Sequence, residues 1–497
     1  MQQRRKSGIL LHPTSLPGAG GIGALGVEAR RFVDFLAGAG QSLWQVLPLG
    51  PVAYGYSPYS CYSAFAGNPL LIDLETIAEE GDITRSDLHL ELPAGKVDFP
   101  RVEQYKNGVL RRAAATFFAG AESARMDEFR QFCDVNSWLH DFALFMALKE
   151  SHGGKSWVRW PRGIACREAA ELARYGELLG EEILFQKYMQ WLFFRQWQEL
   201  KKYANEKGIE IIGDIPIFVA FDSADVWVNP QLFHLDERGR PTVVAGVPPD
   251  YFSETGQFWG NPLYNWDAIA YHGYGWWIER LKGALELYDI VRLDHFRGFE
   301  AYWEIPATDK TAQKGRWVKG PGESLFKALH DALGPLPIIA EDLGVITPDV
   351  EALLFKFGFP GMKILQFAFG SGPENPYLPH NHVREAVVYT GTHDNNTTGG
   401  WFAALSAKEK KVVLEYLNSD GTDIVTDLIR IALASVANMV VIPLQDILKL
   451  DSTARMNVPG TSSGNWSWRF VGNDLGEGDG AKLHDMTQLY GRLKQHK

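Results

Sequence analysis

Short apolar segments that alternate with amphipathic helical patterns are the feature that most restricts how this chain can fold. Eight such segments have the composition of β-strands, and most are separated by a helical pattern. They lie at residues 8–12, 42–47, 209–215, 289–296, 302–305, 337–341, 363–368 and 386–392. Strands that alternate with helices favour a parallel sheet. Eight of them predict an α/β fold, the (β/α)8 TIM barrel, with its active site at the C-terminal ends of the strands.

Two long segments interrupt the alternation. Residues 50–180 follow the second predicted strand and contain a Tyr-rich loop and several amphipathic helices, but no strand of comparable length. Residues 218–270 follow the third strand and predict a long loop rich in aromatic residues. A loop of this length in a compact fold is usually functional or disordered, and the aromatic content argues against disorder. We interpret residues 1–497 as one catalytic barrel that carries both segments as insertions.

The predicted fourth strand, Asp289-Ile-Val-Arg-Leu-Asp-His-Phe296, carries charged residues in an unusual arrangement. Strand side chains alternate between two faces, so Arg292 and Asp294 share one face while Val291 and Leu293 share the other. A buried ion pair would explain an Arg and an Asp on one face. Such a strand is unusual for a packed core, however, and it fits a barrel strand whose C-terminal end opens into an active site.

Carboxylates stand at the ends of three predicted strands. Asp294 ends the fourth, Glu341 the sixth and Asp394 the eighth. Cleavage of a glycoside with retention needs a nucleophilic carboxylate and a protonated carboxyl group, roughly 5 to 5.5 Å apart. Arg292 would keep Asp294 ionised, and the apolar residues before Glu341 would raise its pKa towards that of a proton donor. Asp394, beside His393, could bind sugar hydroxyls. A loop cap or a surface ion pair is the alternative for any single acid.

Aromatic residues in the two insertions are candidates for stacking on sugar rings. Tyr54 and Tyr59 stand among Ser, Gly and Pro, which favours exposure, and Trp259 lies in the second insertion. Packing in the core is the alternative for each of them.

Composition excludes several classes of protein. The net charge of −11, without a basic stripe, argues against a nucleic-acid partner. No apolar run approaches the length of a membrane span or of a signal peptide. Three widely spaced cysteines indicate free thiols, and together these features predict a cytoplasmic protein. No His or Cys spacing fits a metal site, and the Gly-rich residues 18–23 lack the context of a dinucleotide loop, so we expect neither metal nor cofactor.

The motifs resemble those of the amylomaltase-type 4-α-glucanotransferases, a transglycosylase family related to the α-amylase superfamily. The resemblance extends over nearly the whole chain. Its motifs are Gly8–Pro17, Tyr56–Tyr59, Gly213–Pro216, Pro248–Pro262, Val291–Phe299, Ala340–Gly344, Thr390–Asn396 and Asn457–Gly460.

The resemblance implies a (β/α)8 barrel with inserted subdomains and no C-terminal β-domain, acting on α-glucan donors and acceptors. It implies that Asp294 is the nucleophile, Glu341 the general acid/base and Asp394 a stabiliser of the transition state. Donor-site residues would be Asp214, Arg292, His295 and His393. Residues around the acceptor or along the glucan would be Ser57, Tyr59, Asp250, Gln257 and Trp259, with Asn465 as a further binding residue.

The expected activity is transfer of an α-1,4-glucan segment to the 4-hydroxyl of a glucan or of glucose. An α-glucan hydrolase on the same scaffold is the nearest alternative. A non-catalytic glucan-binding protein is the second.

Overall fold

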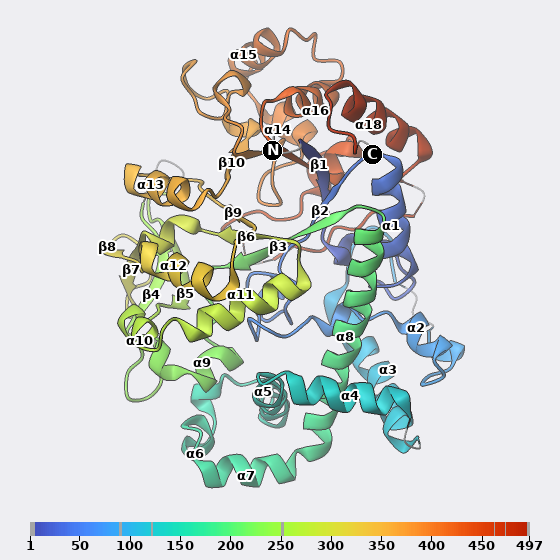
Figure 1. Cartoon of the computed structure of the whole chain (residues 1–497), viewed down its shortest axis with the longest axis vertical. Coiled ribbons are helices and arrows are strands. Elements are labelled where there is room, and N and C mark those ends of the chain that lie inside the picture. The colour runs from blue at the N-terminus through green and yellow to red at the C-terminus, as the bar shows by residue number, and fades with distance from the viewer. Residues whose placement is uncertain are drawn as a thin grey trace.

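The computed structural model describes residues 5–88, 92–120, 123–249, 253–461, 463–472 and 474–494, and its main sheet is a barrel of eight parallel strands (Figure 1). Hydrogen bonding runs in the order β10-β11-β12-β1-β2-β3-β6-β9. The backbone N–H of Ala340, in β9, donates to the carbonyl of Pro360, next to β10, and closes the ring at 3.0 Å. The strands are β1 (Lys6–Leu10), β2 (Leu43–Gln45), β3 (Glu210–Pro216), β6 (Ile290–Asp294), β9 (Ile338–Ala340), β10 (Gly361–Ile364), β11 (Ala386–Tyr389) and β12 (Met439–Pro443). The predicted barrel is confirmed.

One of the eight predicted strands forms as a strand but was wrongly assigned to the barrel. Residues 302–305 lie in β7 (Ala301–Pro306), which belongs to a separate antiparallel sheet. Only the short 3-10 turn Phe296–Phe299 connects β6 to β7, whereas two neighbouring parallel strands need a crossover of about a dozen residues. The eighth barrel strand is β12, which was not predicted. Glu341 therefore follows the fifth barrel strand and Asp394 follows the seventh.

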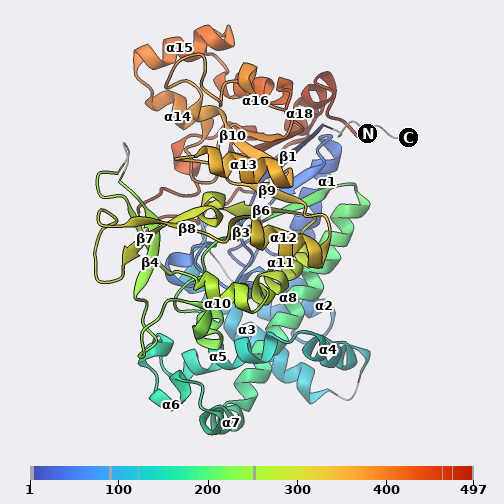
Figure 2. The same cartoon turned by 60° about the vertical axis from the view of Figure 1, so that its left-hand side comes forward.

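The antiparallel sheet has the order β5-β4-β7-β8 and packs beside the barrel (Figure 2). Its other strands are β4 (Val243–Val247), β5 (Gln257–Pro262) and β8 (Arg316–Lys319). The prediction of a loop over residues 218–270 was therefore wrong in part, because β4, β5 and α9 (Ala224–Val228) lie within it and α10 (Trp266–Tyr271) begins in it. Hydrogen bonds from β4 to β7 and β5 satisfy its backbone, which a long irregular loop would leave for water or side chains.

Amphipathic helices surround the barrel. In α1 (Val27–Gly38), Phe32, Val33 and Leu36 recur at helical spacing and are buried. The amphipathic helical patterns of the sequence also form α8 (Gly180–Glu206), α11 (Gly275–Leu287), α15 (Ala407–Leu417) and α16 (Ile424–Ala434). Further helices on the barrel side are α12 (Gly322–Leu333), α13 (Pro348–Phe357), α14 (Thr398–Ala404), α17 (Leu444–Ile447) and α18 (Glu477–Leu489).

A helical region lies between β2 and α8 and forms the end of the molecule opposite α15 (Figure 1). Its helices are α2 (Leu74–Glu79), α3 (Phe99–Ala119), α4 (Ala124–Val135), α5 (Leu139–Ser151), α6 (Arg162–Ala165) and α7 (Ala169–Leu178). The long helix α8 leads from this region back to the barrel. After β12, the described residues form helices and turns without another strand.

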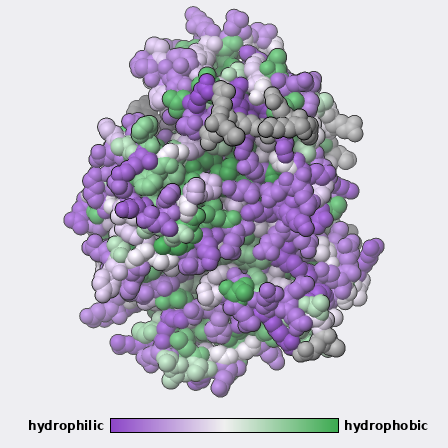
Figure 3. Space-filling model, in the orientation of Figure 1, coloured by the Kyte–Doolittle hydropathy of each residue, from purple (hydrophilic) through white to green (hydrophobic). Residues whose placement is uncertain are grey.

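Hydrophilic residues cover most of the face drawn in Figure 3, and hydrophobic residues are scattered among them in small groups. Among the described residues, no helix combines the length and the apolar character that crossing a bilayer requires.

Candidate active site

A buried network of charges joins β3 and β6 at the C-terminal end of the barrel. Asp214 and Arg292 are register partners on these neighbouring strands. Nη1 of Arg292 donates to both carboxylate oxygens of Asp214, at 2.7 and 2.6 Å, while Nη2 lies 2.9 Å from Oδ1 of Asp294. The Arg292 side chain is only 4% exposed, and burial acts to lower its pKa, but the two carboxylates outweigh burial and raise the pKa well above the usual value. A fixed cation therefore holds Asp294 at the strand end.

Tyr59, from the Tyr-rich loop, completes this network. Its hydroxyl donates to Oδ2 of Asp214 at 2.6 Å, and its ring stacks on His393 with centroids 5.1 Å apart and planes inclined by 18°. Burial raises the pKa of Tyr59 well above its usual value, so the phenol keeps its proton and remains a donor. The loop after β2 is thus linked to side chains at the ends of both β3 and β11.

Glu341 follows β9 and accepts hydrogen bonds from two backbone N–H groups. His295 N donates to Oε2 at 2.6 Å and Leu343 N to Oε1 at 3.0 Å. Burial and the nearby Asp294 carboxylate raise the pKa of Glu341 to about 8, although Arg292 and the two N–H groups oppose the rise. A carboxyl group with this pKa carries a proton at neutral pH, as a general acid must.

His295 follows Asp294 in a left-handed conformation, with φ of 50° and ψ of 50°. This turn directs its N–H to Glu341, and it places the imidazole edge-on against Trp259 with centroids 4.8 Å apart. Burial lowers the pKa of His295 to about 4, so the ring is neutral near pH 7. Backbone strain at a non-glycine residue with positive φ is typical of functional sites.

Asp394 lies beyond β11 and is held from two sides. The amide of Asn457 donates to Oδ1 at 2.6 Å, and His393 Nε2 lies 3.4 Å from Oδ2. Burial acts to raise the pKa of Asp394, but His393 and the Asn457 amide outweigh it and hold the pKa below its usual range. Asp394 is therefore ionised while Glu341 is protonated.

The sequence interpretation missed the residues that fix Asp394. The Arg455 guanidinium donates through Nη2 to the Asp394 carbonyl at 2.6 Å and through Nε to the Asn457 carbonyl at 2.7 Å. Trp466, only 7% exposed, packs its ring near both Tyr59 and His393. The motif Asn457–Gly460 was a signal for this loop, but nothing in its spacing showed that it reaches Asp394.

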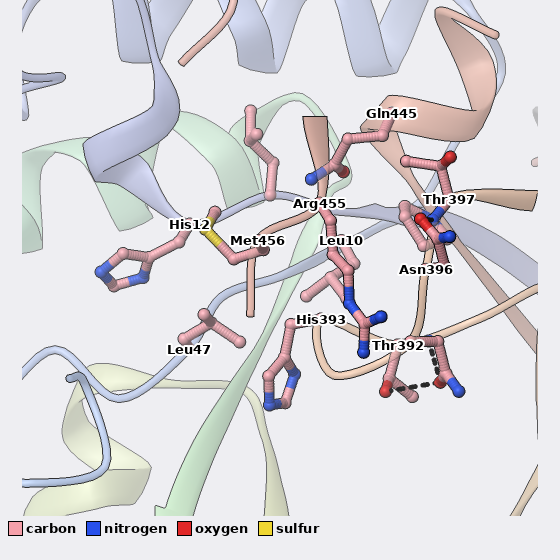
Figure 4. Close-up of a pocket in the computed structure, with 13 residues that line it drawn as sticks. Leu10, His12, Leu47, Thr392, His393, Asn396, Thr397, Gln445, Arg455 and Met456 are labelled. Carbon is pink, nitrogen blue, oxygen red and sulfur yellow. Dashed lines mark hydrogen bonds between the residues drawn. The ribbon is translucent and has the colours of Figure 1, made fainter. Parts of the chain in front are cut away.

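His393 and its neighbours line a small cavity of about 20 Å³ (Figure 4). His12 from the end of β1, Arg455 and Gln445 are among its lining residues. The Nδ1 atoms of His12 and His393 are buried and have no hydrogen-bond partner within the part of the chain that the structure describes. The cavity is large enough for one water molecule.

The other predicted binding residues differ in their exposure and in the hydrogen bonds that they make. Tyr54 is 79% exposed, and Ser57 Oγ accepts from Tyr59 N at 3.2 Å, so its hydroxyl supports the loop. Gln257 Oε1 accepts from Trp259 Nε1 at 3.1 Å. Asn465 accepts from Val458 N and donates to the Thr461 carbonyl, bonds that shape its own loop. Asp250 lies outside the described residues.

The geometry brings together Asp214, Arg292, Asp294, His295, Glu341, Tyr59, Trp259, His393 and Asp394. It offers a carboxylate beside a fixed cation, a protonated carboxyl group and a second ionised carboxylate. Within the described residues, no group of three or more His, Cys, Asp or Glu side chains could hold a metal ion.

Comparison with known proteins decides the family. A model of the 4-alpha-glucanotransferase family matches residues 11–473. The chain belongs to this family. Its activity is that of a 4-α-glucanotransferase, as the motifs predicted, and neither the hydrolase nor the binding protein is favoured.

Individual members of the family are similar to this chain over nearly all of its length. The 4-alpha-glucanotransferase of Thermus thermophilus is 53% identical over 99% of this chain and 100% of its own length. The chloroplastic/amyloplastic 4-alpha-glucanotransferase of Solanum tuberosum is 46% identical over 99% of this chain and 87% of its own. A solved structure of amylomaltase from Streptococcus agalactiae in complex with acarbose has a TM-score of 0.96 and 42% identity, covering 99% of this chain and 100% of that one.

Proposed function

We propose that the chain moves α-1,4-glucan segments from a donor malto-oligosaccharide or amylose to a glucan or glucose acceptor by retaining double displacement. Asp294 is the nucleophile, Glu341 the general acid/base and Asp394 the stabiliser of the transition state. The observation that carries this assignment is the contrast between two neighbouring carboxyl groups. Arg292 holds Asp294 at 2.9 Å, while burial and Asp294 itself raise the pKa of Glu341 to about 8.

In the first displacement, Asp294 attacks the anomeric carbon and the glycosidic C–O bond breaks. Glu341 gives its proton to the leaving oxygen, so the departing chain carries a free 4-hydroxyl group, and the donor segment remains as an ester on Asp294. Positive charge develops on the sugar ring in the transition state. Asp394, whose pKa is lowered, faces that charge as an anion.

In the second displacement, the acceptor 4-hydroxyl attacks the same carbon from the side that the leaving group vacated. Glu341, now a carboxylate, removes the hydroxyl proton while the ester bond to Asp294 breaks. Two inversions give net retention, and both carboxyl groups return to their starting states.

Transfer requires an acceptor sugar to reach the intermediate ahead of water. We assign this task to the two inserted segments, 50–180 and 218–270, because they provide Tyr59 and Trp259 at the rim. Tyr54, Ser57, Asp250, Gln257 and Asn465 are proposed to line the path of the glucan. An acceptor bound in line raises its effective concentration and excludes water.

Incubation with maltotriose tests the proposal. We expect glucose together with longer maltodextrins, with no net gain of reducing ends, and no turnover by Asp294→Ala. New reducing ends without longer products would indicate hydrolysis.

We also propose a cytoplasmic location. The three cysteines, Cys61, Cys133 and Cys166, are free thiols, which fits a reducing compartment. Cell fractionation with antibody detection tests this, and recovery in the medium would contradict it.

A further inference from the structure

A second cavity lies away from the catalytic acids, between the helical region and the barrel. It is open to solvent and has a volume of about 910 Å³, within the roughly 300 to 1,000 Å³ typical of ligand pockets. Its lining residues come from α4, α5, α8, α9 and α11 and from the segments next to them. We call it the interhelical groove. Asp294, Glu341 and Asp394 are not among its lining residues.

Partly exposed aromatic rings form one wall of the interhelical groove. Phe65 and Trp138 lie nearly parallel, with centroids 6.4 Å apart and planes inclined by 19°. Trp276 meets Phe65 edge-on at 6.0 Å, and Phe194 packs against Trp138 at 5.7 Å. All four side chains are of intermediate burial, so each keeps some surface open to solvent. Rings fixed by their neighbours lose little conformational freedom when a ligand stacks on them.

The polar lining selects the chemistry of the ligand. Amide and hydroxyl groups, including Gln131, Ser137 and Gln198, lie among the aromatic residues. Carboxylates outnumber cations: the acids are Glu128, Asp141, Asp225, Glu279 and Glu286, and the bases are Arg195 and Lys282. An anion would face net repulsion here. A neutral polyhydroxyl ligand, with apolar ring faces and hydroxyl donors, matches both the aromatic rings and the acceptor-rich edge.

We propose that the interhelical groove is a second binding site for a malto-oligosaccharide chain, separate from the active site. The choice of an α-1,4-glucan rests on the proposed function, since a long donor supplies segments that extend beyond the catalytic acids. The segment that carries Tyr59 continues through Ser63 and Phe65 into the groove wall. A chain bound in the groove is therefore anchored next to the loop that contacts Asp214.

Calorimetric titration of the full chain with maltoheptaose tests the proposal. The Asp294→Asn substitution prevents turnover during the titration. We expect about two binding sites per chain, and about one after the further substitution Trp138→Ala, with the affinity of the remaining site unchanged. Tyr271→Ala, which removes an 86% exposed aromatic ring outside the groove, is the matched control and retains both sites. A single site before any groove substitution would overturn the proposal.

A second variant covers the case in which Trp138→Ala does not fold. Ser137→Arg adds a bulky cation at an exposed position of the groove and removes no core side chain. It is expected to remove the same site. With Asp294 intact, Ser137→Arg should keep the rate on maltotriose and raise KM for long amylose several-fold. Retention of both sites, or a change of molar mass by light scattering that reveals a second copy in the groove, would contradict the inference.

These outcomes are separable from failure of the proposed function. If the wild-type chain shows no turnover, the titration still counts binding sites. If turnover is normal and only one site is found, the groove proposal fails alone.

Discussion

The side-chain amide of Asn457 donates to Oδ1 of Asp394 at 2.6 Å, and through this bond a loop far along the chain orients a proposed catalytic carboxylate. Asn457 N also donates to the His393 carbonyl at 3.2 Å. The loop and the end of β11 are therefore fixed to one another through both backbone and side chain.

Asn457→Ala should lower kcat because Asp394 loses the donor that fixes its carboxylate. A misplacement of about 1 Å in a catalytic group can cost about 100-fold, so we expect a loss of roughly 10- to 100-fold. Disproportionation of maltotriose, followed by glucose release, measures the effect. Thr453→Ala, which removes an exposed hydroxyl from the preceding turn, is the control. Equal kcat in both variants would show that Asn457 does not position Asp394.

Arg292→Met should destabilise the fold as well as abolish activity. Asp214 would remain buried without its cation, and removal of one partner from a buried ion pair typically costs about 3 to 5 kcal/mol. Urea unfolding of the wild type and the variant measures the difference. The double variant Arg292→Met/Asp214→Asn should recover part of the stability but no activity. A single variant as stable as the wild type would show that Asp214 tolerates burial alone.

The raised pKa of Glu341 predicts two effects of pH. Glu341 must be protonated in the first displacement, so activity should fall as pH rises through about 8. This loss of activity at high pH should be absent from any residual activity of Glu341→Gln. In the unfolded chain the Glu341 pKa is near its ordinary value, about 4.3. The folded state therefore binds the extra proton between those two values, and the stability contributed by this group falls as pH rises across that window.

Thermal unfolding at two pH values checks the sign of the linkage. Relative to the wild type, Glu341→Gln should gain more in Tm at pH 8.5 than at pH 5, because glutamine does not ionise. An equal difference at both pH values would contradict the raised pKa.

Trp259→Ala should shift the products from transfer towards hydrolysis. Trp259 and Phe258 are neighbours on β5 with similar exposure, 38% and 39%, but adjacent strand residues point to opposite faces. Trp259 contacts His295, so its loss opens the site to water, whereas Phe258→Ala serves as the matched control. The ratio of new reducing ends to longer maltodextrins measures the shift. A similar ratio in both variants would remove Trp259 from acceptor binding.

The sequence predicted most of the barrel because strand and helix periodicities are local. The prediction was wrong where the connection between two strands determines which sheet a strand joins. β7 has the composition of a barrel strand, and only the short turn after Asp294 shows that it cannot be a barrel strand. The pairing of Arg292 with Asp294 was visible from alternation. The pairing with Asp214 depends on the register between β3 and β6, and that of Asp394 with Asn457 depends on a contact across many residues. Neither is encoded in local spacing.

The central claim is that Asp294 forms a covalent bond to the donor sugar, and trapping that bond tests it most directly. Glu341→Gln can form the ester from α-maltosyl fluoride, because fluoride leaves without a proton, but the variant lacks the base that speeds its release. After rapid acid quench and proteolysis, mass spectrometry should place a maltosyl group on the peptide that contains Asp294. An adduct on Asp394, or no adduct together with a product of inverted configuration, would contradict the account.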